Sequence, residues 1–418
     1  MKVSVIGLGY IGLPTAAMFA SRQVEVIGVD VSRHVVDTVN KGQIHIVEPE
    51  LDGLVHAAVK GGYLTARLEP EAADAFLIAV PTPFKNGHEP DVSYVQSAAE
   101  KIAPVLKHGD TVILESTSPV GTTEQMLQWL SAARPDLRFP EVGVDRSAID
   151  IHVAYCPERV LPGHVVRELV ENDRIVGGIT PACSQRAIEV YRTFVQGELI
   201  VTNARTAEMC KLTENAYRDV NIAFANELSL ICDRLDINVW ELISAANHHP
   251  RVNILKPGCG VGGHCIAVDP WFIVSKTPEE ARVVRTAREV NDHKPVWVVR
   301  KVNEQVEKLR IEGRDPTSLK IAMLGLAFKP DIDDLRESPA LHIARDIRAS
   351  ISGEIMAVEP NIEVLPDGLD GVRLVSLEDA LNEADLAVVL VAHSPFVVAR
   401  EKLKELSNII DVTGVIHG

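Results

Sequence analysis

The sequence predicts an α/β fold, with two Rossmann-like domains of doubly wound parallel sheet joined by a connector of long helices. Strand patterns alternate with helix patterns, the first strand runs into a glycine-rich turn, and the same order of elements begins again near residue 319. A chain of 418 residues is also too long for one ordinary hydrophobic core. We expect a dinucleotide-binding domain over residues 1–200, a helical connector over 201–312 and a second Rossmann-like domain over 313–418.

The first expected strand covers residues 2–6, an apolar run without alternation that is typical of a parallel strand covered on both faces. Gly7, Gly9 and Gly12 follow it with the spacing Gly-x-Gly-x-x-Gly and lead into a helix over residues 14–20. Between a strand and a helix, such glycines make a tight turn and let a pyrophosphate approach the backbone. The N-terminus of the helix adds N–H groups that bind phosphate. A glycine-rich turn without a ligand is the alternative.

A second strand over residues 24–29 ends in Asp30. The number of residues between the glycine-rich turn and Asp30 is the usual one for a carboxylate that binds a ribose 2′-hydroxyl. The carboxylate would repel a 2′-phosphate, which favours NAD over NADP, although Arg33 is near enough to attract one.

Further strands are expected at residues 75–80 and 111–115 and, after a surface excursion over 134–151, at 152–155. The first two run into segments rich in Thr and Ser, which include Thr82 and Thr117. Ligands bind at the carboxyl ends of parallel strands, so these hydroxyl groups are candidate ligand contacts.

The second half repeats this order. Residues 319–330 echo the first strand and turn without the glycine fingerprint, and residues 354–359 and 386–393 echo the following strands. Lys329 stands at the equivalent turn, where it would suit a different phosphate-bearing ligand. Long helical patterns cover residues 204–235 and 278–309, and the Gly- and Pro-containing segment 308–318 is the expected linker.

The glycine-rich loop over residues 258–270 places Cys265 behind a run of glycines and four residues before Asp269. Glycines let a ligand approach the thiol, and unpaired main-chain N–H groups favour the thiolate, which is the reactive form. The loop therefore suits covalent catalysis, whereas a tight turn around a small buried Cys is the alternative. Residue types alone leave both interpretations open. A metal site is not expected, because the spacing of Cys259, His264 and Cys265 matches no zinc pattern.

Lys211, Asn215 and Arg218 are spaced to share one face of the first connector helix. A solvated polar face would show the same pattern, so the pattern alone does not define a site.

Composition excludes several classes of partner. The net charge of −16 disfavours nucleic acid and anionic membranes, and no apolar run is long enough to span a bilayer. The N-terminus carries no export signal, and six cysteines lie scattered without a framework spacing. These features predict a cytoplasmic protein.

The motifs above resemble those of the nucleotide-sugar 6-dehydrogenases, the UDP-glucose dehydrogenase superfamily. The resemblance covers nearly the whole chain, with matching blocks at residues 7–12, 79–83, 115–121, 155–163, 208–215, 262–265, 327–330 and 335–338. Residues 249–253 and 289–295 look like the branch that acts on UDP-N-acetyl-D-mannosamine, with the UDP-N-acetylglucosamine and UDP-glucose enzymes as alternatives.

The resemblance implies a four-electron oxidation of C6 from alcohol to carboxylate with two molecules of NAD, in the synthesis of a surface polysaccharide. Cys265 would attack the aldehyde to give a thiohemiacetal, whose oxidation gives a thioester that water hydrolyses. Lys211 and Asn215 would stabilise the oxyanion at C6, and Lys211 would also shuttle a proton. Asp269 would orient or activate water, with Glu158 as a second candidate.

The resemblance also assigns binding residues and a homodimer, because the position of Arg251 reaches the neighbouring subunit's site in relatives. The residues implied for the UDP-N-acetylhexosamine substrate are Arg159, Val160, Lys211, Asn215, Arg218, His249, Arg251, Asn253, Gly262, Phe328 and Lys329. Those implied for the cofactor are Gly7, Gly9, Tyr10, Ile11, Gly12, Asp30, Thr82, Thr117, Thr123 and Arg336.

Two segments depart from the family pattern. Cys259 replaces the second proline of a Pro-Gly-Pro-Gly segment, which puts another thiol near Cys265, and the chain ends in Ile416-His417 where relatives have Trp-Arg. A non-catalytic NAD-binding regulatory protein is the remaining alternative, although such a protein should have lost at least one of the candidate catalytic residues.

Overall fold

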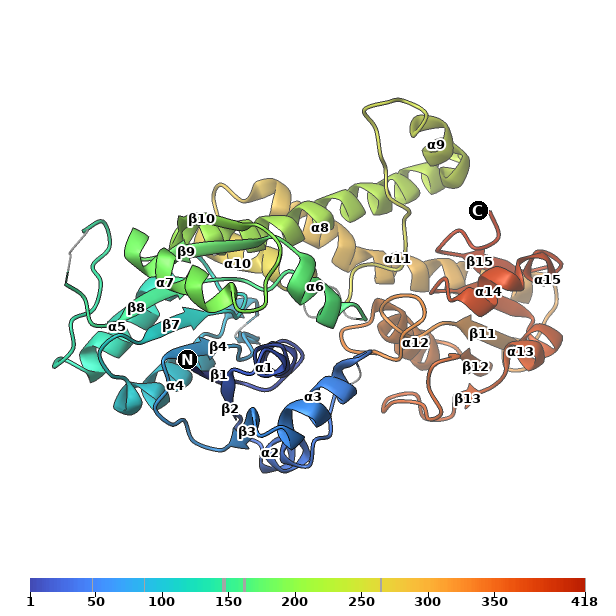
Figure 1. Cartoon of the computed structure of the whole chain (residues 1–418). Coiled ribbons are helices and arrows are strands. Elements are labelled where there is room, and N and C mark those ends of the chain that lie inside the picture. Colours follow the sequence, from blue (N-terminus) through green and yellow to red (C-terminus); the bar gives the residue numbers. More distant parts are fainter. Residues whose placement is uncertain (47, 86, 145–147, 161–162, 264, 418) are drawn as a thin grey trace. The chain divides into compact units, whose positions relative to one another are not determined.

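The computed structural model describes residues 1–46, 48–85, 87–144, 148–160, 163–263 and 265–417. The chain forms two compact units (Figure 1). The first holds Met1–Glu214 and Trp271–Lys276, and the second holds Asn215–Pro270 and Thr277–Gly418. Each unit is built around a sheet of its own.

The first unit contains an eight-stranded sheet in the order β10-β9-β8-β7-β4-β1-β2-β3. Read from β3 to β8, this is the strand order of a dinucleotide-binding Rossmann sheet, in which the ligand crevice opens between β1 and β4. The strands are β1 (Lys2–Ile6), β2 (Glu25–Val29), β3 (Leu64–Arg67), β4 (Ala75–Ile78), β7 (Thr111–Leu114), β8 (His152–Tyr155), β9 (Arg174–Gly178) and β10 (Leu199–Asn203). The sheet is not wholly parallel, because β9 pairs with β8 in the antiparallel sense.

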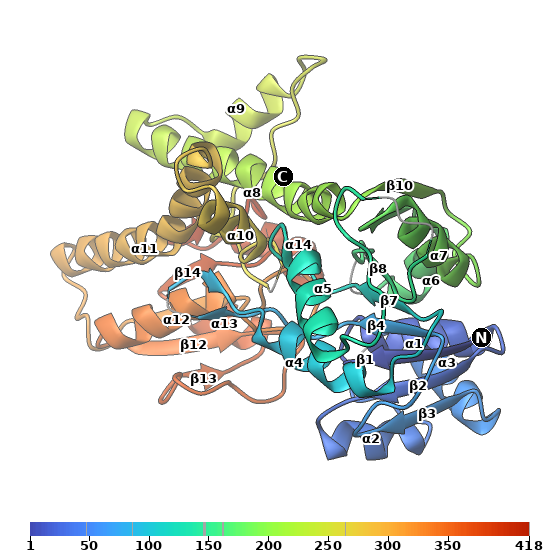
Figure 2. The same cartoon turned by 90° about the vertical axis from the view of Figure 1, so that its left-hand side faces the viewer.

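Helices cover both faces of this sheet (Figure 2). Apolar residues of α1, α2, α3, α6 and α7 form one core cluster with the strands, and those of α4 and α5 belong to a second. The bounds are α1 (Gly12–Ser21), α2 (Arg33–Asn40), α3 (Leu51–Lys60), α4 (Ser93–Ile102), α5 (Thr122–Ala133), α6 (Val165–Glu171) and α7 (Pro181–Tyr191). A 3-10 turn (Ala103–Val105) follows α4, and a hairpin of β5 (Phe84–Lys85) and β6 (Glu89–Pro90) follows β4.

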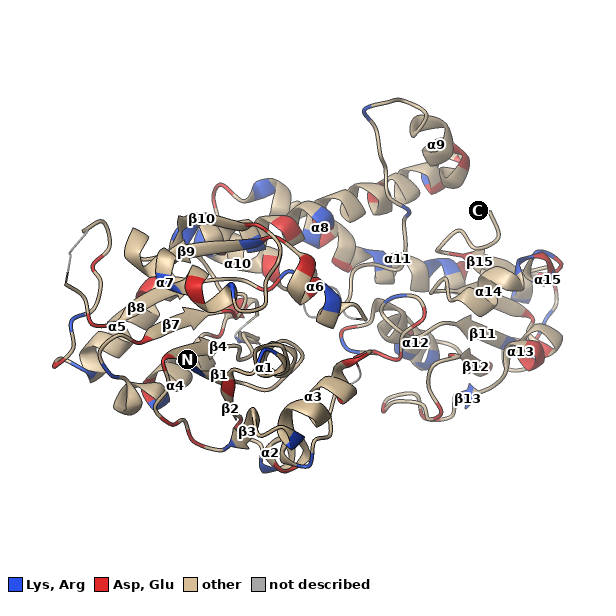
Figure 3. Cartoon of the chain, viewed as in Figure 1, with Lys and Arg blue, Asp and Glu red and all other residues tan. Residues whose placement is uncertain are grey.

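The predicted connector helices are present. The first is α8 (Ala204–Leu235), which crosses the boundary between the two units, and α9 (Val239–Ala246) follows it. The glycine-rich loop then leads to α10 (Asp269–Lys276), and α11 (Arg282–Ile311) forms the second long helix. Lys and Arg are interspersed with Asp and Glu along α8 and α11 (Figure 3). Because α11 continues to Ile311, the linker is shorter than expected.

The second unit contains a parallel five-stranded sheet in the order β13-β12-β11-β14-β15. Its strands are β11 (Lys320–Leu324), β12 (Glu354–Val358), β13 (Arg373–Leu374), β14 (Leu386–Val389) and β15 (Ile409–Asp411). Its helices are α12 (Pro339–Ser350), α13 (Leu377–Glu383), α14 (Ser394–Val398) and α15 (Arg400–Lys404). The prediction of two Rossmann-like sheets joined by long helices is thus confirmed.

The two sheets begin with the same turn. Gly7 after β1 has φ +92°, and Gly325 after β11 has φ +96°. A Cβ atom on Gly7 would stand 2.5 Å from the main-chain oxygen of Ala79, and one on Gly325 would stand 2.5 Å from Cβ of Val391. Both positions therefore require glycine, for backbone conformation and for space. The second domain keeps the first glycine of the fingerprint, although not the other two.

No helix among the described residues is long and apolar enough to cross a membrane.

Candidate active site

The three glycines of the fingerprint have different structural roles. Gly7 makes the turn, and a Cβ on Gly12 would stand 1.8 Å from the main-chain oxygen of Gly7, so the start of α1 packs directly on the strand. A Cβ on Gly9, by contrast, would meet no atom within 4 Å. Gly9 is exposed, so the open space in front of it suits close approach of a pyrophosphate to the backbone. Tyr10 and Ile11 lie in the same turn.

Asp30 holds this turn together from the end of β2. Its Oδ2 accepts a hydrogen bond of 3.0 Å from the N–H of Leu8, and its Oδ1 accepts one of 2.8 Å from the N–H of Ser32. The side chain is half-buried. A carboxylate offers about four acceptor sites, so two remain for a ribose hydroxyl. These residues therefore fit an adenine dinucleotide.

The hydroxyl residues after β4 and β7 meet at the same edge of the sheet. Thr82 donates through its hydroxyl to the main-chain oxygen of Thr117 at 2.6 Å. Thr123 lies in the first turn of α5, where its buried hydroxyl donates to Oε1 of Glu208 at 2.6 Å. Thr82 and Thr117 thus stand where a ligand is expected, whereas the Thr123 hydroxyl is occupied by a carboxylate that sequence reasoning did not single out.

The structure describes all six cysteines, and among them only Cys265 is exposed. Its main-chain oxygen accepts hydrogen bonds from the N–H groups of Val268 and Asp269, at 3.1 and 2.9 Å. This turn places Asp269 one helical turn after the thiol, at the start of α10. An accessible thiol beside a buried carboxylate suits covalent catalysis better than a packing role.

Asn215 contacts this carboxylate. Its side-chain Nδ2 donates to Oδ2 of Asp269 at 2.5 Å, so α8 and the start of α10 are joined next to the Cys265 turn. Lys211, which is half-buried, lies one turn earlier on α8 and belongs to the first unit. The spacing of four residues puts Lys211 and Asn215 on one face of the helix, as expected from the sequence. Arg218 on the next turn is exposed.

Glu158 lies in the first unit, three residues after β8, and is buried. Its Oε1 accepts a hydrogen bond from the N–H of Arg159 at 2.7 Å, and its Oε2 accepts one from Nη2 of Arg174 at 2.6 Å. The Arg159 side chain forms an ion pair with Glu214, 2.7 Å from Nη2 to Oε1. Val160 packs against the apolar core of the first sheet. Sequence reasoning gave no role to Arg174.

The glycine-rich loop packs against the turn that follows β11. A Cβ on Gly262 would stand 2.5 Å from the main-chain oxygen of Glu337 and 2.8 Å from Cβ of Phe328. Gly263, with φ +80°, faces the ring of Phe328. The structure therefore brings together Gly262 and Phe328, two of the residues assigned to the substrate, and Lys329 follows in the same turn.

Cys259 does not share the environment of Cys265. It is 7% exposed, and its thiol donates to the main-chain oxygen of Leu390 at 2.9 Å. Burial raises the pKa of this thiol to about 12, so it stays protonated. It therefore packs the start of the loop onto the second sheet. His264 lies outside the described residues. Among those described, no group of three or more His, Cys, Asp or Glu side chains could hold a metal ion.

The remaining substrate candidates lie on an exposed loop after α9. Asn247 closes this loop, because its amide donates to the oxygen of Ile254 at 3.0 Å and its Oδ1 accepts from the N–H of Ile254 at 2.7 Å. His249, Arg251 and Asn253 are exposed on it. Arg336, which was assigned to the cofactor, belongs to the second unit and forms an ion pair with Asp334 at 2.6 Å.

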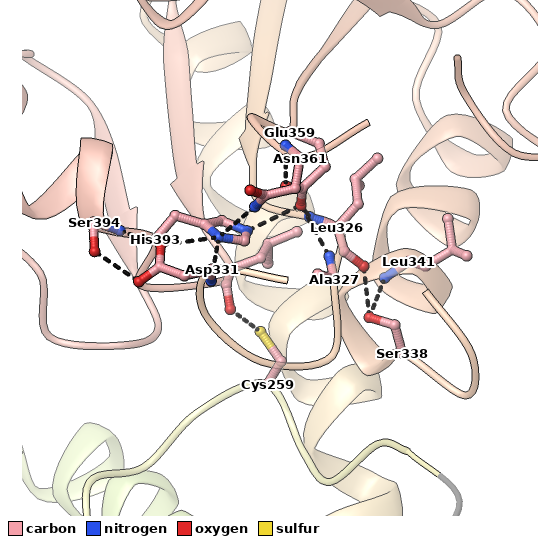
Figure 4. A network of polar contacts seen from close by, with 11 residues as sticks. Cys259, Leu326, Ala327, Asp331, Ser338, Leu341, Glu359, Asn361, His393 and Ser394 are labelled. Atoms are coloured by element: carbon pink, nitrogen blue, oxygen red, sulfur yellow. Dashed lines mark hydrogen bonds and ion pairs between the residues drawn. The ribbon is translucent and has the colours of Figure 1, made fainter. Parts of the chain in front are cut away.

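In the second domain Glu359 follows β12 as Asp30 follows β2 in the first. Figure 4 shows the contacts of Glu359. Its Oε2 accepts hydrogen bonds from the N–H groups of Leu326 and Ala327, at 2.7 and 3.0 Å. The fully buried ring of His393 also contacts this oxygen, at 3.0 Å from Nε2. Its Nδ1 accepts from the N–H of Asp331, so the proton of a neutral ring is on Nε2 and points to Glu359. The counterpart of Asp30 in the second domain therefore has one oxygen occupied by two main-chain N–H groups and the His393 ring.

The Rossmann sheet with an open glycine turn fits a dinucleotide-dependent oxidoreductase, and the second unit holds an accessible thiol one turn before a buried carboxylate. Residues 1–195 match the NAD binding domain of the UDP-glucose/GDP-mannose dehydrogenase family, residues 205–293 its central domain and residues 322–418 its UDP binding domain. The chain belongs to the UDP-glucose/GDP-mannose dehydrogenase family. The prediction of NAD as cofactor is thereby confirmed.

Individual relatives are similar over nearly the whole chain. A UDP-N-acetyl-D-mannosamine dehydrogenase from Yersinia pestis is 63% identical over 417 residues, which cover 99% of this chain and 98% of the relative. An NDP-N-acetyl-D-galactosaminuronic acid dehydrogenase from Ralstonia nicotianae is 64% identical over 394 residues, 94% of this chain and 91% of the relative. The solved structure of a UDP-D-ManNAc dehydrogenase from Pyrococcus horikoshii has a TM-score of 0.87 and 39% identity, and covers 100% of this chain and 96% of its own.

Proposed function

We propose that this protein oxidises UDP-N-acetyl-D-mannosamine at C6 to UDP-N-acetyl-D-mannosaminuronate, with two NAD+ consumed and one water added for each sugar. The observation that carries the proposal is the exposed thiol of Cys265, one turn before an Asp269 carboxylate that Asn215 binds. The relatives named for UDP-N-acetyl-D-mannosamine support the choice of sugar.

The first oxidation converts the C6 alcohol to an aldehyde. NAD+ supplies the acceptor for the hydride, held at the Gly7–Gly12 turn and at Asp30. The alcohol proton leaves to a base, for which Lys211 is the candidate, and Asn215 donates to the oxyanion that develops at C6. Because Asn215 also donates to Asp269, its amide is fixed in orientation.

The second oxidation proceeds on the enzyme. The thiolate sulfur of Cys265 forms a bond to the aldehyde carbon, and the carbonyl oxygen takes up a proton, which gives a thiohemiacetal. Loss of a second hydride to a second NAD+, and of the hydroxyl proton, leaves a thioester. The covalent bond keeps the aldehyde from escaping between the two oxidations.

Water then hydrolyses the thioester. Water oxygen bonds to the acyl carbon, the carbon–sulfur bond breaks, and the carboxylate leaves with the thiolate restored. Asp269 and Glu158 are the two carboxylates proposed to orient or activate this water. Asp269 is 3% exposed and Glu158 7%, so each would act on an ordered water rather than on bulk solvent.

A second candidate substrate is an NDP-N-acetylgalactosamine, because the Ralstonia relative at 64% identity is named for N-acetyl-D-galactosaminuronic acid. UDP-N-acetylglucosamine and UDP-glucose remain alternatives with the same chemistry, and a non-catalytic NAD-binding regulatory protein is the alternative of another class. All four sugars offer the same primary alcohol at C6.

The test is the number of NADH molecules formed per sugar consumed, with each UDP-sugar supplied separately. Two NADH per UDP-N-acetyl-D-mannosamine, with little from the others, would establish both chemistry and substrate. Cys265→Ser is expected to stop turnover before the acid is released, and full four-electron turnover by this variant would exclude the covalent route. Two NADH from another sugar would keep the chemistry and change the substrate.

The wider setting is also a proposal. We assign cofactor binding to residues 1–200, catalysis and dimerisation to 201–312 and UDP binding to 313–418, and a cytoplasmic role in surface polysaccharide synthesis. A homodimer is supported by α8, on which Tyr217, Phe224, Ile231 and Leu235 are exposed at spacings of seven, seven and four residues. Such a stripe is apolar surface that a second copy would cover. Sedimentation of the purified protein tests it.

A further inference from the structure

A buried cluster of charged side chains lies at one edge of the first sheet. Glu115 follows β7, Glu158 follows β8, and Arg174 begins β9, while Tyr191 reaches the cluster from the end of α7. Because β9 runs antiparallel to β8, its first residue lies beside the chain that leaves β8. All four side chains are at most 7% exposed. The proposed reaction uses only Glu158, so the other three need a separate explanation.

The contacts centre on Arg174. Its Nη2 donates to Oε2 of Glu158 at 2.6 Å, and its Nη1 lies 3.7 Å from Oε1 of Glu115. The hydroxyl of Tyr191 donates to that same oxygen of Glu115 at 2.6 Å. The guanidinium carbon stands 4.8 Å from the centre of the Tyr191 ring and 5.5 Å from that of Phe194. Two aromatic rings therefore hold the cation in place.

The charges do not balance when both carboxylates are ionised, because two anions then face one buried cation. Burial raises the pKa of Glu115 to about 7; the charge of Glu158 adds to this effect, and Arg174 opposes it. The neighbouring Cys156 thiol and the Tyr191 hydroxyl stay neutral, since burial raises the pKa of Cys156 to about 12 and that of Tyr191 well above its ordinary value. Glu115 is thus the member of the cluster that changes charge near neutral pH.

We propose that Arg174 is a positioning residue for Glu158, and that ionisation of Glu115 weakens this positioning by drawing the guanidinium toward a second carboxylate. Arg174 and the N–H of Arg159 hold one oxygen of Glu158 each. A carboxylate has about four acceptor sites, so two remain for a water molecule. The inference rests on the proposed function, in which Glu158 acts on the water that hydrolyses the thioester.

The long Arg174–Glu115 contact fits this assignment. Among the described residues, neither Nη1 of Arg174 nor Oε2 of Glu115 has a hydrogen-bond partner. With Glu115 protonated, the tight bond of the guanidinium goes to Glu158. With Glu115 ionised, Nη1 of Arg174 has a charged acceptor that a small movement would bring within hydrogen-bond distance. Charge-assisted hydrogen bonds are stronger than neutral ones, so the guanidinium would be drawn away from Glu158.

The first test is Arg174→Met, with Arg167→Met as the matched control, because Arg167 is exposed and pairs with Glu171 on α6. With UDP-sugar and NAD, we expect Arg174→Met to form two NADH per subunit rapidly and then to turn over about 10–100-fold more slowly. Intact-protein mass spectrometry should show the sugar acyl group on Cys265. Arg174→Lys keeps the charge without the planar guanidinium, so its turnover rate should lie between those of Arg174→Met and Arg167→Met. Such a graded loss would show that Arg174→Met is not merely misfolded.

The second test is Glu115→Gln, which cannot ionise. The ratio of its hydrolysis rate to that of the wild type is expected to rise several-fold between about pH 6 and pH 8, because only the wild type gains a second carboxylate in that range. A purely structural role for Glu115 would leave the ratio constant.

Three outcomes would each overturn the inference and leave the proposed function standing. The first is unchanged thioester hydrolysis in Arg174→Met, and the second is an equal loss of the first hydride transfer in that variant. The third is parallel pH profiles of hydrolysis for Glu115→Gln and wild type. Absence of NADH from every UDP-sugar in the wild type would overturn the proposed function, and the inference with it.

Discussion

Asn226 accepts, through its side-chain oxygen, a hydrogen bond of 2.9 Å from the main-chain N–H of Gly258. The amide nitrogen of Asn226 donates to Asn291 at 2.8 Å, and Asn291 donates in turn to Oδ1 of Asp219, also at 2.8 Å. These three side chains are buried. Helices α8 and α11 therefore fix the first residue of the loop that leads to Cys265 through linked buried hydrogen bonds.

Asn226→Ala is expected to lower the free energy of unfolding by about 1–3 kcal/mol, because it leaves the half-buried Gly258 N–H and the buried Asn291 oxygen without this partner. Urea unfolding measures this loss. Asn221→Ala is the control on the same helix, since the Asn221 amide only donates to the main-chain oxygen of Tyr217. Equal stabilities of the two variants would show that the buried bonds contribute nothing specific.

Gly262→Ala is expected to reduce both stability and turnover, because the new Cβ would stand 2.5 Å from the main-chain oxygen of Glu337. Gly258→Ala is the matched control in the same loop, where a Cβ meets nothing within 4 Å. Thermal unfolding and NADH formation compare the two. If Gly258→Ala were the more damaging change, the close packing of Gly262 on the turn after β11 would not be what limits stability and turnover.

Alkylation is expected to modify Cys265 well before Cys259. The first thiol is exposed, whereas the second is buried and its pKa is raised to about 12, so little thiolate forms. Peptide mass mapping after brief treatment of the native protein with iodoacetamide measures the order. Denatured protein serves as the control, since all six cysteines should then react. Early labelling of Cys259 in the native protein would contradict its burial.

Asp30→Ala is expected to raise the KM for NAD by at least about ten-fold, because the ribose loses a charged hydrogen-bond partner and the turn loses the bond to Leu8. Asp37→Ala in α2 is the control, since Asp37 is exposed on the neighbouring helix. Initial rates at varied NAD concentration give both values. An unchanged KM for Asp30→Ala would remove this carboxylate from the cofactor site.

The pH dependence of stability should contain a contribution from Glu115. Its pKa is about 7 in the folded protein and close to 4.5 when unfolded, so between these values the folded state binds more protons. Stability is therefore expected to fall as pH rises from about 4.5 to 7, by on the order of 1–3 kcal/mol. Urea unfolding at several pH values should show this fall in wild type and a smaller one in Glu115→Gln; equal slopes would contradict the assignment.

Site residues could be predicted from the sequence where a residue type stands in a local pattern that has one main chemical use. Asp30 follows the strand after the glycine-rich turn, and Cys265 follows a run of glycines with Asp269 four residues on, so both candidate sites could be predicted from spacing. Arg174 has no such signal. It reaches Glu158 only because β9 reverses direction beside β8, and the direction of a strand is a property of tertiary pairing rather than of local pattern.

Thr123 was assigned to the cofactor by the family resemblance, and that assignment stays a prediction. The structure gives its hydroxyl to Glu208, which lies on α8, 85 residues along the chain. A partner from so far away leaves no trace in the local pattern.

The turns at Gly7 and Gly325 show which glycines the main chain requires and which serve only to leave space for a ligand. Chain geometry demands both Gly7 and Gly12 in the first half, and the second half keeps only the counterpart of Gly7, at Gly325. In the second half, one oxygen of Glu359 already contacts the His393 ring and two main-chain N–H groups. A second dinucleotide pocket could therefore be designed here only by two changes together, the removal of the His393 contact and the addition of the two missing glycines.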